Sequence, residues 1–236
     1  MTVKELKSLL ERLLEGAVRK KLSYTDFLRL LATYSHPSEF DFADFHDILT
    51  MIKRFSEEVA RASNNLPLMM LRAGDLVKKG YRPFLVDCFG LPEVYEVYAR
   101  ITKKCGALAV SVEPYINALA LTSEFERAYG GPTMLELAKA LGTSLYKSTD
   151  KAVHEELGEP MSLNSLLSLA KLRLKSVAER LAEDLVIAKK AIAISDHGYD
   201  VYRSPPDKYY LRHGREGRLA KIAPLIIVEC LPHTHL

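Results

Sequence analysis

The order of apolar and polar residues divides the chain near residue 80. In the first part, apolar residues recur at spacings of three and four, which places them on one face of a helix. The repeats are Leu6, Leu9, Leu10, Leu13 and Leu14, and later Phe45, Ile48, Leu49, Ile52 and Phe55. Turn-forming residues interrupt this pattern at His36-Pro37-Ser38 and at Asn64-Asn65-Leu66-Pro67. We therefore predict a helical N-terminal region over residues 1–80.

From residue 81 to residue 236, short apolar runs alternate with helical patterns. The strand candidates are Phe84–Cys88, Ala107–Glu113, Thr143–Lys147, Ala191–Ser195 and Leu225–Cys230, with Tyr209–Arg212 as a weaker one. The helical patterns between them are Leu91–Lys103, Thr133–Leu141 and Ser162–Lys189. Such alternation predicts an α/β domain with a mainly parallel sheet and helices on both faces.

The triplet Asp196-His197-Gly198 directly follows the apolar run Ala191–Ser195. A carboxylate and an imidazole just beyond a buried strand can reach one cation in the crevice where open α/β sheets bind their ligands. The glycine allows a tight turn there. Taken alone, the triplet is also an ordinary turn sequence.

Further residues of metal-binding type occur in order along the chain. Asp87 follows the apolar run Pro83–Val86, and His213 comes sixteen residues after His197. Asp150 and His154 are four residues apart, so on a helix they share one face. Each residue also has an ordinary structural role, such as a helix cap or a turn. The joint order, with the pair Thr122-Ser123 between Asp87 and Asp150, favours two metal sites.

The order Asp, Thr or Ser, Asp-x-x-x-His, Asp-His, His resembles the alkaline phosphatase superfamily, which includes phosphatases, phosphodiesterases, phosphoglycerate mutases and the PglZ domain. The resemblance covers residues 83–229. It implies one metal held by Asp87, Asp196 and His197 beside the nucleophile Thr122, and a second metal held by Asp150, His154 and His213. Three protein ligands per ion leave positions open for phosphate oxygens, as a catalytic site requires.

What the resemblance implies is a metal-dependent phosphoesterase that uses a metal-activated threonine and two divalent ions, zinc or manganese. No organic cofactor is needed for this chemistry. One alternative is a PglZ-like binding or assembly module that keeps its metals but has weakened catalysis. Another is a phosphotransferase such as a mutase, which additionally needs an acceptor pocket.

Three assignments stay open in the sequence. Ser123 is adjacent to Thr122 and is the second candidate nucleophile. His233 and His235 near the C-terminus compete with His213 as the last ligand. Arg212 and Arg215 flank His213, where they either bind the phosphoester substrate or belong to a solvated loop.

Composition limits the remaining choices. The 236 residues carry a net charge of +3, which implies no strong field for polyanions but does not exclude nucleic acid. No run of apolar residues is long enough to span a membrane, and the charged N-terminus lacks the pattern of a signal peptide, so we expect a cytoplasmic protein.

The residue types also point to the conditions in which the protein works. The three cysteines, Cys88, Cys105 and Cys230, have no zinc-binding spacing and cannot all pair, which suits a reducing compartment. The absence of Gln, together with 27% charged residues, is typical of thermophilic proteins. A homo-oligomer or a protein partner is expected to use the helical N-terminal region, because the candidate chemistry lies after residue 83.

Overall fold

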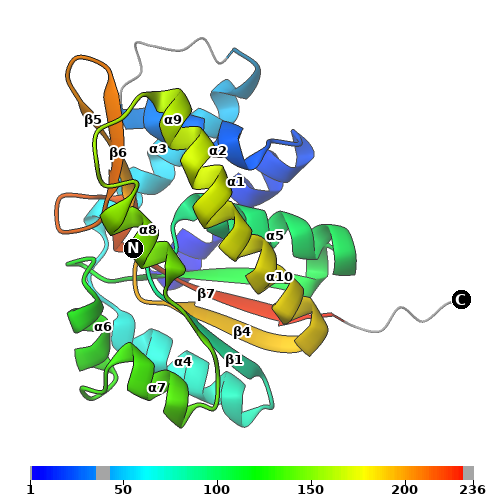
Figure 1. Cartoon of the computed structure of the whole chain (residues 1–236). Helices are drawn as coiled ribbons and strands as arrows, with labels where there is room; N and C mark the ends of the chain where they lie inside the picture. The colour runs from blue at the N-terminus through cyan, green and yellow to red at the C-terminus, as the bar shows by residue number, and fades with distance from the viewer. Residues whose placement is uncertain (1, 36–42, 231–236) are drawn as a thin grey trace, which may run out of the picture.

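The computed structural model describes residues 2–35 and 43–230 (Figure 1). Within these two ranges, four α-helices precede the first strand: α1 (Val3–Arg19), α2 (Tyr24–Ser35), α3 (His46–Arg61) and α4 (Leu66–Lys78). Thr2 and Glu5 form a capping box at the start of α1, since each side chain accepts the other residue's backbone N–H. Pro67 lies in the first turn of α4, where a proline removes no helical hydrogen bond.

In the part of the chain that the structure describes, five strands form one mixed sheet in the order β2-β7-β4-β1-β3. Their bounds are β1 (Arg82–Val86), β2 (Val110–Ile116), β3 (Leu145–Tyr146), β4 (Lys190–Ser195) and β7 (Ile222–Glu229). β1 pairs in parallel with β3 and β4, whereas β7 is antiparallel to both β4 and β2. The predicted α/β class is confirmed, but half of the strand pairings are antiparallel. The other four strands therefore run in one direction and end at one edge of the sheet, which we call the carboxyl edge.

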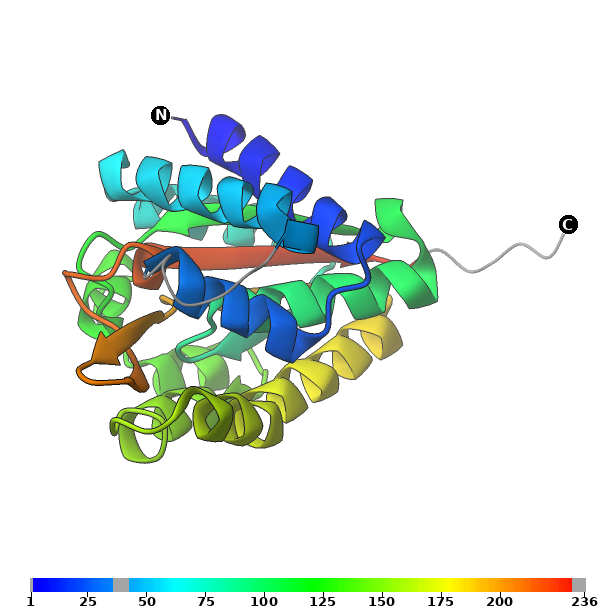
Figure 2. The ribbon, with the colours of Figure 1, turned by 90° about the horizontal axis from the view of Figure 1, so that it is seen from above.

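Helices cover both faces of this sheet (Figures 1 and 2). Those that follow β1 are α5 (Leu91–Cys105), α6 (Thr122–Ala128), α7 (Met134–Ala140), α8 (Ser148–Glu155), α9 (Leu163–Ala170) and α10 (Ser176–Ala188). A π-helical turn, Lys171–Lys175, joins α9 to α10, so the predicted helix Ser162–Lys189 is one nearly continuous segment. α4, α6 and α7 lie on one face, and α1, α2, α3, α5, α9 and α10 lie on the other.

Alternating side chains of β1 join the sheet to its two helical layers. Phe84 and Val86 belong to the larger core, which they share with α1, α2 and α3, while Leu85 belongs to the smaller core with α4. The first 78 residues therefore supply helices to both layers and share their apolar cores with the strands. The boundary expected near residue 80 stays a prediction.

A two-stranded antiparallel hairpin, β5 (Asp200–Ser204) and β6 (Lys208–Arg212), is inserted between β4 and β7. The sequence predicted the second of these strands weakly and missed the first. Asp200–Ser204 contains only two apolar residues, Val201 and Tyr202, which is too few to show a strand pattern. The hairpin matters because His213 follows β6 directly.

Cys105, at the end of α5, and Cys230, just after β7, form a disulfide bond. Cys88 is a free thiol that is buried. The three cysteines therefore no longer support a reducing compartment, because two of them pair. Within the described residues, no helix is both long enough and apolar enough to cross a membrane.

Candidate metal centre

The carboxyl edge of the sheet gathers residues that are far apart in the sequence. Asp87 follows β1, and Asp196 and His197 follow β4, which is hydrogen-bonded to β1. These three residues, the first cluster, are almost completely buried, with exposed fractions of 8%, 0% and 0%. Each offers one ligand atom, and the three atoms lie within 4.8 Å of one another. The structure thus brings together the set assigned to the first metal.

Thr122, the first residue of α6, lies against the first cluster. Its Oγ1 donates a hydrogen bond to Asp196 Oδ2 over 2.7 Å and lies 3.3 Å from His197 Nε2. Ser123 is exposed, and no hydrogen bond joins it to either set of ligands. Of the two candidate nucleophiles, the geometry favours Thr122.

The backbone sets the tautomer of His197. Its Nδ1 lies 3.0 Å from the carbonyl oxygen of Gly198, which can only accept a hydrogen bond. In the neutral ring, Nδ1 therefore carries the hydrogen and Nε2 has a free lone pair. This lone pair faces Asp196 Oδ2, 3.2 Å away. A carbonyl that orients the far side of a histidine ring in this way is typical of metal-binding histidines.

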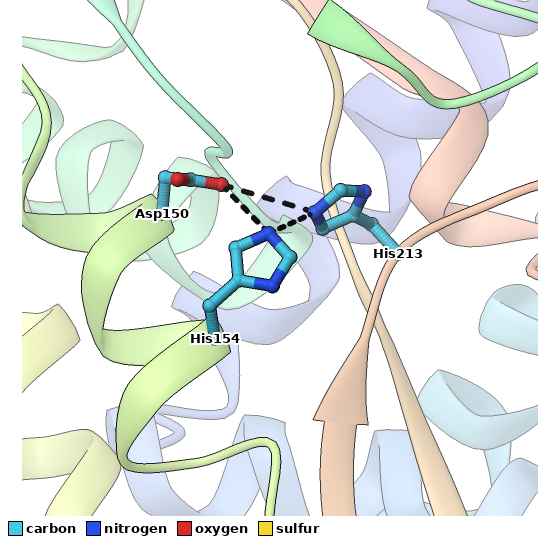
Figure 3. A group of neighbouring side chains, drawn as sticks. All are labelled: Asp150, His154 and His213. Carbon is cyan, nitrogen blue, oxygen red and sulfur yellow. Dashed lines mark hydrogen bonds and ion pairs between the residues drawn. The ribbon is translucent and has the colours of Figure 1, made fainter.

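The second cluster consists of Asp150 and His154 on α8 together with His213 after β6 (Figure 3). The two Nε2 atoms are 2.7 Å apart, and they lie 3.3 Å (His154) and 3.8 Å (His213) from Asp150 Oδ1. His213 Nδ1 lies 3.1 Å from the carbonyl oxygen of Ala120, so in the neutral ring its Nε2 carries a lone pair, which accepts a hydrogen bond from His154 Nε2. All three ligand atoms therefore point to one position. The competing His233 and His235 lie outside the described residues.

The two clusters adjoin through their histidines. The rings of His197 and His213 have centroids 4.3 Å apart, and their planes are tilted by 30°. Burial lowers the pKa of His213, and the neighbouring His197 lowers it further. The two groups of candidate ligands therefore adjoin and form one continuous group of side chains.

The first cluster concentrates negative charge in a buried place. Burial raises the pKa of Asp87 to about 8, and the nearby Asp196 and Asp150 carboxylates add to this shift. Asp87 Oδ1 is buried and has no hydrogen-bond partner among the described residues. A buried carboxylate oxygen is costly without a partner. A divalent cation would supply that partner and favour the ionised form of Asp87.

The segment from Asn117 to Thr122 makes hydrogen bonds with residues of both clusters. The side-chain amide of Asn117 is fully buried and donates to the carbonyl oxygens of Leu121, over 2.8 Å, and Asp196, over 3.0 Å. Asn117 thus holds Leu121, which directly precedes Thr122, in place relative to Asp196. Asp196 is the residue that accepts the Thr122 hydrogen bond. The same segment presents the Ala120 carbonyl to His213. The sequence did not identify this role, because a lone Asn at the end of a strand has no distinguishing pattern.

Two more features help to hold the residues next to the first cluster in place. Cys88 adopts a left-handed backbone conformation, with φ of 58°, and its N–H donates to Asp196 Oδ1 over 3.0 Å. Such a conformation is costly for a residue other than glycine, so packing must hold it in place. Behind this turn, the buried carboxylate of Glu93 accepts hydrogen bonds from the hydroxyls of Tyr24 and Tyr199. The position of Tyr199, directly after Asp196-His197-Gly198, was the available signal for this network.

The predicted substrate-binding residues lie on the protein surface beside the second cluster. Arg212 and Arg215 are exposed, and neither makes a hydrogen bond or ion pair with the residues described. Both line a hollow that includes His213. The remaining described histidine, His46, is exposed and belongs to neither cluster, while His36 lies outside the described residues.

Comparison of the sequence with protein-family models and with curated proteins found no match in either case. The geometry of the two clusters and the order of their residues along the chain are therefore the basis for assigning a function.

Proposed function

We propose that the protein is a metal-dependent phosphoesterase that resembles the alkaline phosphatase superfamily, including its PglZ-domain members. The observation that carries the proposal is the position of Thr122 Oγ1, which contacts one of two adjoining clusters of three ligands. A phosphoryl group seated between the clusters would face this hydroxyl. The candidate ligands after β1 and β4 also lie at the end of a parallel strand pair, where an α/β sheet binds its ligands.

The ligand chemistry supports two divalent ions, zinc or manganese. Each cluster mixes imidazole nitrogen with carboxylate oxygen, a combination that suits these metals. Asp87 Oδ1, which is buried without a partner, is a fitting ligand atom for the first ion. When bound, such ions lower the pKa of a coordinated hydroxyl and stabilise the charge on attacking and leaving oxygens.

The protein's own residues then perform the remaining steps. Asp196 Oδ2 holds the hydroxyl hydrogen of Thr122, which orients the oxygen's lone pairs. Thr122 Oγ1 attacks phosphorus as its hydroxyl proton passes to Asp196 Oδ2. The bond from phosphorus to the leaving oxygen breaks, and the leaving oxygen takes up this proton and departs as the alcohol. Water then hydrolyses the resulting phospho-threonine and restores the hydroxyl. Arg212 and Arg215 beside the second cluster are suited to hold phosphate oxygens of the substrate.

The decisive experiment combines metal analysis with hydrolysis assays. The purified protein should contain about two divalent ions per chain and should hydrolyse a chromogenic phosphomonoester or phosphodiester. Thr122→Ala should keep the metals and lose most hydrolysis, whereas the matched variant Ser123→Ala should keep both. Inactivity of Ser123→Ala alone would move the nucleophile by one residue. Full metal content without any hydrolysis would instead support the binding module.

We also propose a cytoplasmic location in a thermophile. The Cys105–Cys230 disulfide is compatible with this, because intracellular proteins of hyperthermophiles are a known exception to the rule of reduced thiols. Fractionation of the source cells, with detection of the protein in each fraction, tests the location. Alkylation of thiols in freshly lysed cells, followed by peptide mass spectrometry, tests whether the disulfide forms there. Alkylated Cys105 and Cys230 would show that the bond does not form in the cell.

A further inference from the structure

Two tyrosines stack on the outer face of the β5–β6 hairpin, next to the second cluster. Tyr202 and Tyr210 lie opposite each other across the strands, with ring centroids 5.6 Å apart and planes within 20° of parallel. The other face of the hairpin turns Val201, Tyr209 and Leu211 into the core, where they are at most 3% exposed. Tyr202 and Tyr210 are only partly buried. Their rings are therefore not needed to fill the core.

Basic side chains continue this face of the hairpin. Residues two apart on a strand share a face, so Lys208, Tyr210 and Arg212 follow one another along β6. Both basic residues are exposed. The acidic residue opposite Arg212, Asp200, is buried and accepts hydrogen bonds from the backbone N–H groups of Leu219 and Ala220. This face of the hairpin therefore carries the pair Tyr202 and Tyr210 between two basic residues, Lys208 and Arg212. Arg212 directly precedes His213.

Two hollows connect the tyrosines to the metal-ligand histidines. One, of about 360 Å³, is lined by Tyr210, Arg212, His154 and His213 among others. The other, of about 250 Å³, is lined by Tyr202, Arg212, His213 and Arg215, with Glu216 as its acidic member. Arg212 and His213 border both hollows. A phosphate at His213 therefore has space on two sides, with a tyrosine bordering each space.

From this juxtaposition we infer that the hairpin binds single-stranded nucleic acid and guides one of its phosphodiesters to the two clusters. The cleavage part of the inference rests on the proposed function, whereas the binding part does not. Bases stack on aromatic rings, and the backbone phosphates pair with Arg and Lys. A phosphodiester carries a nucleotide on each side, which matches two hollows better than a phosphomonoester does. We call Tyr202, Lys208, Tyr210 and Arg212 the binding strip. Because the net charge of the chain is only +3, binding of a polyanion would be confined to this strip and would not extend over the whole surface.

The test measures binding of a fluorescently labelled 12-nucleotide single strand by anisotropy, with the full chain freed of metal by a chelator. Tyr210→Ala should weaken binding by about 5- to 150-fold, the usual range for one stacked base. Tyr210→Phe keeps the ring and should bind like the wild type. Arg212→Ala should weaken binding and its salt dependence, while the control Lys78→Ala, an exposed change at the end of α4, should not.

Two competitors separate stacking from charge alone. A strand of the same length with abasic sites keeps the phosphates, so it should bind much more weakly than the intact strand. Polyglutamate of matching charge should compete poorly. Equal binding of the abasic strand, strong competition by polyglutamate, or unchanged binding by both the Tyr210→Ala and Arg212→Ala variants would overturn the inference. DNA and RNA strands of one sequence show whether the 2′-hydroxyl contributes.

Oligonucleotide binding without hydrolysis of any phosphoester would contradict the proposed function alone. Hydrolysis of a small chromogenic phosphodiester by a protein that binds no oligonucleotide would contradict the binding strip alone. Circular dichroism of each variant checks that it is folded.

Discussion

The two clusters use the same kinds of ligand at very different depths. The first cluster is at most 8% exposed and sits directly on the ends of paired strands. In the second cluster, the side chains of His154 and Asp150 are 58% and 31% exposed, and the ligands come from a helix and from a hairpin. His213, with a side chain 12% exposed, lies between these extremes.

This difference in burial should affect the stability of the protein and the ease with which a bound metal ion is removed. The first-cluster ligands are buried in the absence of any ion, and Asp196 and His197 are also hydrogen-bonded, so changing these residues disturbs the fold as well as the chemistry. The second-cluster ligands are held mainly by their own elements, so changing them should disturb chemistry alone. We therefore expect the ion at the second cluster to be removed first by a chelator.

The largest effect is expected from Asp196→Asn, which keeps the shape of the side chain and removes its charge. Hydrolysis should fall by at least about 1000-fold, since metal-assisted charge stabilisation contributes several kcal/mol to the rate. Metal content should fall by about one ion per chain. Asp75→Asn, an exposed change on α4, is the control. An Asp196→Asn protein with full metal and full activity would remove Asp196 from the site.

The comparison is tested most directly by two histidine variants in metal-free protein. His197→Ala should lower the free energy of unfolding by about 2–4 kcal/mol, because it leaves a buried cavity and removes the hydrogen bonds of the imidazole ring to Thr122 and to the Gly198 carbonyl. His154→Ala should change it by no more than about 0.5 kcal/mol, as is usual for an exposed side chain. Urea denaturation measures both values. Equal losses would show that depth does not separate the two clusters.

A smaller loss is expected when the hydrogen bonds of Asn117 are removed. Asn117→Ala should reduce hydrolysis about 100-fold by loosening Thr122, a magnitude typical of a misplaced catalytic group. Metal content should stay at the wild-type level, because Asn117 donates only to carbonyl oxygens. Hydrolysis and metal content are measured on the same samples. If both fall together, the role of Asn117 is to hold the ligands and not the hydroxyl.

The strand-end ligands could be predicted from the sequence, since an aspartate after each of two apolar runs reaches the same edge whenever the strands are parallel. Asp150 and His154 could be predicted from their helical spacing. The direction of β7 could not, because a run of apolar residues looks the same in either direction. The contact between His213 and His154 could not be predicted either. The two residues are 59 positions apart in the sequence, and their contact depends on where the β5–β6 hairpin packs.

The smallest effect concerns the network behind the first cluster. Burial raises the pKa of Glu93 from 4.5 to about 7. The folded protein therefore holds a proton that the unfolded chain releases, and stability falls as pH rises from about 4.5 to about 7. Between pH 5 and pH 8 this contributes roughly 2 kcal/mol, which Glu93→Gln should remove. Thermal unfolding of both proteins across this range measures the difference, and parallel curves would contradict it.

The Cys105–Cys230 disulfide has a consequence for how the chain responds to cleavage. It closes a covalent ring of the intervening residues, and this ring contains Thr122 and every ligand except Asp87. A protease cut at the exposed turn of the hairpin, around Pro206, would leave His154 and His213 on separate segments that are still covalently tied. On a gel without reductant such a nicked chain should migrate as one species, and it should part into two only after reduction.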